Sequence, residues 1–202
     1  MPRGRYRHHD PHDGTPLGEE HFQCALGPAG WRYVSGSGPA GAVDLTLDAH
    51  GRPLRLELRT ADWQVRGTAL DGVTWVRQAV DGTEAEEGNA PARGFTGASP
   101  AFLVATAHLL RLTPAAPTAR VRLVDLAPPV LAPRTREESW TLLGSERHDT
   151  DAGPLIVDHY RVTDLETGQA RQVHLAGDVL LAAPGLELED LDSPPSRLRP
   201  EE

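Results

Sequence analysis

The chain has 202 residues, 39% of them hydrophobic, a single cysteine and a formal net charge of -9 at pH 7. Its length suits one well-packed domain, and its negative charge, with arginines scattered singly, argues against a nucleic-acid partner. No apolar run approaches the roughly 18 residues of a membrane-spanning helix, and one cysteine excludes an intrachain disulfide.

The two ends of the chain show no apolar periodicity. Residues 1–18 are rich in Arg, His, Asp, Pro and Gly, and residues 193–202 read S-P-P-S-R-L-R-P-E-E. We therefore expect two disordered tails around a single domain at 19–192. The histidines of the first tail would bind a metal only if that tail were ordered, so we expect no metal site there. The start lacks the hydrophobic stretch of a signal peptide, and we expect a cytoplasmic protein.

Alternating apolar and polar residues predict five or six antiparallel strands between His21 and Val80. The strongest pattern is a hairpin at 43–48 and 54–59, with apolar side chains on one face and charged or polar side chains on the other. Asp71-Gly72 is a further hairpin turn.

Residues 81–98 separate these strands from the next apolar segment. They are glycine-rich, acidic and non-periodic, which predicts a long loop. Such a loop either contacts a ligand as a lid or is an excursion that the fold tolerates.

A helix is predicted over 99–112. Ser99 is a good N-cap, Pro100 suits the first helical position, and Arg111 complements the helix dipole in the last turn. At about 100° per residue, the apolar side chains cover roughly 220° of the circumference. His108 and Arg111 share the one narrow polar stripe, so most of this helix should be covered by other elements.

More strands are predicted after the helix, at 119–126, 140–149, 155–162 and 170–181. The whole pattern indicates an α+β domain, in which a strongly curved antiparallel sheet of about nine or ten strands wraps around one main helix.

The turn at Glu166–Gly168 suits a three-residue loop with Gly168 in the left-handed conformation. That loop would set His159 opposite Leu175, and His159 would face inward.

Signatures of nucleotide binding, α/β-hydrolase chemistry and zincin chemistry are missing from the sequence. All 20 basic residues are arginine, so no lysine can form a Schiff base. The cluster His148-Asp149-Thr150-Asp151 stands at a strand end, where such residues commonly serve the turn. We therefore assign no catalytic residue, metal or cofactor.

His108, Arg111 and His159 are candidate ligand contacts, because one helix stripe and one inward strand face could meet at the edge of an apolar interior. Alternatively, the first two form the solvent face of the helix and His159 is a hydrogen-bonded core histidine. In a ligand site, the opening should lie beside the polar stripe and the segment 81–98. An unperturbed His108, with a pKa of roughly 6.5, would make the affinity for an anion rise as the pH falls.

Four segments carry a resemblance to a known group of proteins: G-W-R-Y, L-R-L-E-L-R-T-A-D-W, D-G-V-T-W and G-F-T-G-A-S-P-A-F-L-V-A-T-A-H-L-L-R-L, at 30–33, 54–63, 71–75 and 94–112. Their order resembles the half-barrel of the LolA and LppX carriers, and more closely the cytoplasmic glycolipid-binding proteins that share this fold. An acidic D-x-D segment, expected in that family before the helix, is replaced here by G-F-T-G.

The resemblance implies an apolar cavity between a half-barrel sheet and helical segments. With it, we count Trp63 and Trp75 as ligand contacts beside the three polar residues. The chain is thus expected to be a non-catalytic binder of a hydrophobic or amphipathic small molecule, lipid-like or glycolipid-like. The alternative is a structural or interaction module with a fully packed interior that forms a homodimer through its sheet.

Overall fold

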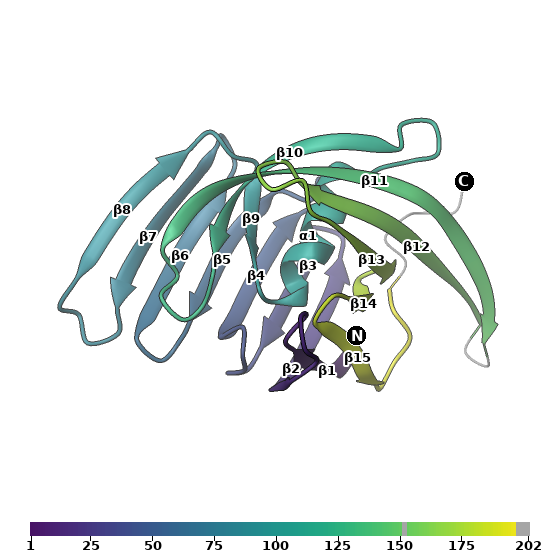
Figure 1. The fold of residues 1–202 in the computed structure, drawn as a ribbon, viewed down its shortest axis with the longest axis horizontal. Helices are drawn as coiled ribbons and strands as arrows, with labels where there is room; N and C mark the ends of the chain where they lie inside the picture. The colour runs from purple at the N-terminus through teal and green to yellow at the C-terminus, as the bar shows by residue number, and fades with distance from the viewer. Residues whose placement is uncertain (151–152, 197–202) are drawn as a thin grey trace.

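The computed structural model describes residues 1–150 and 153–196. Within these residues the chain forms one 15-stranded sheet and one helix (Figure 1). The elements are β1 (Arg3–His9), β2 (Pro16–Gly27), β3 (Gly30–Ser35), β4 (Ala42–Asp48), β5 (Pro53–Arg59), β6 (Trp63–Ala69), β7 (Val73–Ala79), β8 (Ala85–Ala90), β9 (Gly94–Gly97), α1 (Pro100–Leu110), β10 (Thr118–Leu126), β11 (Pro133–Thr150), β12 (Gly153–Asp164), β13 (Ala170–Ala176), β14 (Val179–Ala183) and β15 (Leu186–Leu191).

The sheet runs in the order β8-β7-β6-β5-β4-β3-β2-β1-β15-β14-β13-β12-β11-β10-β9. Neighbouring strands are antiparallel except β9 and β10, which are parallel. The expected half-barrel of about nine or ten strands around a main helix is therefore wrong. The structure is a much larger sheet with one short helix, and several of its strands carry no alternating pattern that would reveal them.

The sheet curves back on itself, so that the short edge strand β9 packs against β6, which lies near the opposite edge in the strand order. A Cβ atom placed at Gly67 in β6 would lie only 2.6 Å from Cζ of Phe95 in β9. The helix lies inside this arrangement and contacts β4, β9 and β14. Strands from both halves of the chain thus enclose one core.

The helix begins and ends close to where the sequence predicts. Ser99 is the N-cap, and its side chain accepts a hydrogen bond from the amide of Ala101. Eight of the 11 helical residues, from Pro100 to Leu109, are buried. In the part of the chain that is described, no helix is long and apolar enough to cross a membrane.

The hairpin of β4 and β5 confirms the strongest strand prediction, with one exception. Val43, Leu45 and Leu47 are buried, as the alternation requires. Leu54, however, is exposed, because the register shifts beside Leu47 and turns this residue outward.

The predicted disordered tail at 1–18 is wrong, because it contains β1 and the start of β2. Strand β1 pairs with β2 on one side and with β15 on the other. Tyr6 is fully buried, and its hydroxyl accepts a hydrogen bond from the amide of Leu180. The partner strand comes from the opposite end of the chain, so local periodicity could not show this pairing.

The predicted tail at 193–202 lies only partly in the described residues. The amide of Ser196 donates a 2.6 Å hydrogen bond to the carboxylate of Asp178, which attaches this segment to the domain. Residues 197–202 lie outside the described part.

The predicted long loop at 81–98 is also wrong, because it contains β8 and β9. Strand β8 is at an edge of the sheet, and its charged side chains Glu86 and Glu87 are exposed. An edge strand with two polar faces gives no alternating signal, and charges on it discourage pairing with another chain.

A buried carboxylate connects the first strands to the helix. Glu20 is completely buried and accepts hydrogen bonds from the hydroxyls of Tyr33, at 2.8 Å, and Ser99, at 2.7 Å. Nε2 of His8 lies 3.0 Å from the same carboxylate. These contacts satisfy the buried group and fix the N-terminus of α1 against β1, β2 and β3.

Candidate functional site

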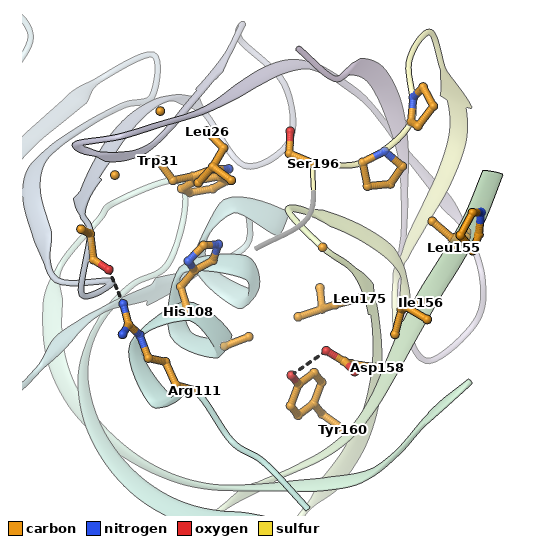
Figure 2. Close-up of a pocket in the computed structure, with 18 of the residues that line it drawn as sticks. Leu26, Trp31, His108, Arg111, Leu155, Ile156, Asp158, Tyr160, Leu175 and Ser196 are labelled. Carbon is orange, nitrogen blue, oxygen red and sulfur yellow. Dashed lines mark hydrogen bonds between the residues drawn. The ribbon is translucent and has the colours of Figure 1, made fainter. Parts of the chain in front are cut away.

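A cavity of about 640 Å³ opens beside the C-terminal end of α1, and we call it the α1 cavity (Figure 2). Its walls come from the hairpin of β2 and β3, the turn after β4, the end of α1, strands β12 and β13, and the segment 194–196. Apolar side chains line much of it, among them Leu26, Trp31, Ala107, Leu155, Ile156 and Leu175. Segments far apart in the sequence therefore build one concave site.

Arg111 lies at the edge of this cavity and ends the helix in the left-handed conformation, with φ 47° and ψ 45°. Its guanidinium donates a hydrogen bond to the backbone carbonyl of Ala49 (Figure 2). Among the described residues it forms no ion pair with a carboxylate. This wall of the cavity thus presents a cation that no acidic side chain neutralises.

His108 lines the same wall, one turn before Arg111, and its ring stacks on Trp31 with 5.8 Å between the ring centroids. Burial, and then the charge of Arg111, lowers the pKa of His108 to about 4. Its Nε2 is buried and has no hydrogen-bond partner among the described residues. The imidazole is uncharged near neutral pH, so the unperturbed pKa of roughly 6.5 considered for it does not hold in this structure.

Asp158 and Tyr160 stand on the other side of the cavity, on β12 (Figure 2). The Asp158 carboxylate accepts hydrogen bonds from the hydroxyls of Ser145 and Tyr160, the second at 3.4 Å. Asp158 is half-buried, and within the described chain it forms no ion pair with an arginine or histidine. This wall therefore presents a negatively charged carboxylate that can accept hydrogen bonds.

The structure brings His108 and Arg111 together but places the other predicted residues elsewhere. Trp63 is covered by the guanidinium of Arg77, whose carbon lies 3.2 Å from the ring centroid. Trp75 packs against the backbone of Gly88, where a Cβ atom would lie 2.3 Å from the indole ring. Neither tryptophan lines the α1 cavity.

His159 also lies outside the cavity lining. It pairs with His174 rather than with Leu175, because the turn spans Leu165–Gly168 and is one residue longer than predicted. Gly168 does adopt the predicted positive φ, 72°. The shift of one residue turns His159 away from the core, where its Nδ1 lies 2.6 Å from Nδ1 of His174.

The opening was also expected beside residues 81–98, and none of these lines the cavity. The end of the β11–β12 hairpin, through Thr150 and Leu155, takes that place. Sequence reasoning missed Trp31 and Asp158 as site residues. Trp31 was visible as part of the G-W-R-Y segment, whereas the position of Asp158 depends on the long-range course of the hairpin.

Within residues 1–150 and 153–196, no group of three or more His, Cys, Asp or Glu residues could hold a metal ion. Cys24 is buried, and burial, with the charge of Asp178, raises the pKa of its thiol. A protonated buried thiol is a weak nucleophile.

A solved structure resembles this fold. It is the crystal structure of a DUF1089 family protein from Pseudomonas aeruginosa, with a TM-score of 0.51, 16% sequence identity and coverage of 83% of each chain. At this identity the likeness shows the fold alone. No protein-family model and no curated protein matches the chain.

Proposed function

We propose that the chain is a non-catalytic binding protein for a hydrophobic or amphipathic small molecule held in the α1 cavity. The observation that carries this proposal is the composition of the cavity. It combines a volume of about 640 Å³ with apolar walls and a few polar groups at its sides. Small-molecule sites typically have this mixture and volumes of about 300 to 1,000 Å³.

The conformation of Arg111 supports an anionic group on the ligand. A glycine would end the helix in the left-handed conformation without steric cost, whereas an arginine there is strained. In return, the chain places a guanidinium at the cavity wall, and a guanidinium binds a carboxylate or phosphate through paired donors. The uncharged His108 next to it adds a hydrogen-bonding group at the same wall.

The proposal is tested by titrating a fluorescent fatty acid into the wild-type chain and the Arg111→Leu variant at low salt. We expect a loss of affinity of about tenfold or more, which corresponds to about 1.4 kcal/mol and to one charge-assisted hydrogen bond. Arg120→Leu is the matched control, because Arg120 is exposed on β10 and does not line the cavity. Equal affinity of all three folded proteins would remove Arg111 from the site.

Native mass spectrometry after gentle purification distinguishes this function from the alternative. A co-purified apolar adduct on the monomer supports a binding protein. A ligand-free dimer would instead support a structural module that associates through its sheet.

A further inference from the structure

The α1 cavity carries charges of opposite sign on two facing walls. Arg111 lies on one side and Asp158 on the other, with Leu175 beside Asp158 (Figure 2). Neither charged group forms an ion pair with any described residue. Each therefore remains available to a complementary group inside the cavity.

The other charged and titratable groups of the lining do not change this pattern. Asp48 is already neutralised by Arg52, whose Nε lies 2.7 Å from the carboxylate, and accepts two backbone hydrogen bonds. His108 is uncharged near neutral pH. Arg111 and Asp158 thus remain as the two charges of the described lining that have no charged partner.

The Asp158 carboxylate can accept more hydrogen bonds than its described neighbours donate to it. A carboxylate can accept about four hydrogen bonds, and the described chain supplies two, from Ser145 and Tyr160. The group is only half-buried and lines the cavity, so a ligand can reach its remaining acceptor positions. A cationic donor on a ligand would occupy them.

We propose, resting on the function proposed above, that the ligand is dipolar. Its anionic group binds Arg111, its apolar body lies along Trp31 and Leu175, and a cationic nitrogen binds Asp158. The class of ligand is therefore an amphiphile with a carboxylate or similar anion at one end and an ammonium group at the other. Such a ligand matches both walls, whereas a simple fatty acid leaves Asp158 unpaired.

Isothermal titration calorimetry with three probes of one chain length tests this assignment. The probes are dodecanoate, its ω-amino derivative and dodecylamine. We expect the ω-amino derivative to bind at least about tenfold more tightly than either single-charge probe. Asp158→Asn should abolish this advantage. Glu146→Gln, which removes an exposed charge from the same hairpin outside the cavity lining, should keep it.

The outcomes separate the two proposals. If dodecanoate binds as tightly as its ω-amino derivative, the dipolar ligand is wrong and the binding function stands. If none of the three probes binds the folded wild-type chain, both proposals are wrong. The comparison of probes on the wild-type chain is decisive even where Asp158→Asn fails to fold.

Discussion

Replacing Arg111 by glycine and, separately, by alanine distinguishes the backbone role of this residue from its role in binding. Both variants remove the guanidinium and its hydrogen bond to Ala49. Only glycine also removes the strain of a left-handed residue at the helix end, where φ is 47°. The difference between the two variants therefore isolates the cost of the backbone conformation.

The size of this difference follows from two opposing terms. The left-handed conformation costs an L-residue about 1 to 2 kcal/mol. The greater freedom of glycine in the unfolded chain offsets about 0.4 to 1 kcal/mol of that gain. We expect Arg111→Gly to have a free energy of unfolding about 1 kcal/mol larger than that of Arg111→Ala.

Equilibrium urea unfolding of the two variants measures this difference, provided that their m-values agree. A fatty-acid titration of the same samples should show equal losses of affinity, because both lack the guanidinium. Equal stability of the two variants, or a more stable alanine variant, would refute strain at Arg111. It would also remove the reason to infer that the arginine is kept for its side chain.

Three further predictions concern the core and the cavity. Because the pKa of His108 is lowered from 6.5 to about 4 on folding, the unfolded chain binds more protons between these pH values, and stability should rise with pH in that window. His108→Gln should flatten this slope in urea unfolding measured across the window; an unchanged slope would contradict the buried, uncharged imidazole. Gly67→Ala should lose about 1 to 3 kcal/mol of stability, because its Cβ would lie 2.6 Å from Phe95, whereas the control Gly144→Ala meets no atom within 4 Å. Thermal unfolding compares them, and equal midpoints would mean that β9 does not pack on β6. Cys24 should react with iodoacetamide only when urea unfolds the chain, since burial raises the pKa of its thiol; rapid labelling in native buffer would show an accessible thiol.

Features set by neighbouring residues could be predicted from the sequence. The helix is an example, because Ser99, Pro100 and Arg111 act within one turn of its ends. The hairpin of β4 and β5 is another, since polar and buried apolar side chains alternate along its strands. His108 and Arg111 share one wall of the α1 cavity because His108 lies in the last turn of that helix and Arg111 is its C-cap.

Features set by distant partners could not be predicted. Strand β1 depends on β15, which comes from the other end of the chain, and on the buried carboxylate of Glu20, which pairs with His8. The prediction that His159 faces inward failed for a local reason. The turn between β12 and β13 is one residue longer than its sequence suggests. In a sheet, one residue of register exchanges the inner and outer faces, so a small error moved this histidine out of the site.

The tryptophan indoles offer the most direct test of the central claim, that a ligand occupies the α1 cavity. The chain has four tryptophans, and only Trp31 lines the cavity. In a proton–nitrogen correlation spectrum, titration with dodecanoate should shift the indole signal of Trp31 and leave those of Trp63, Trp75 and Trp140 in place. Shifts at Trp63 or Trp75 with Trp31 unchanged, or no shift at any indole, would contradict the proposed site.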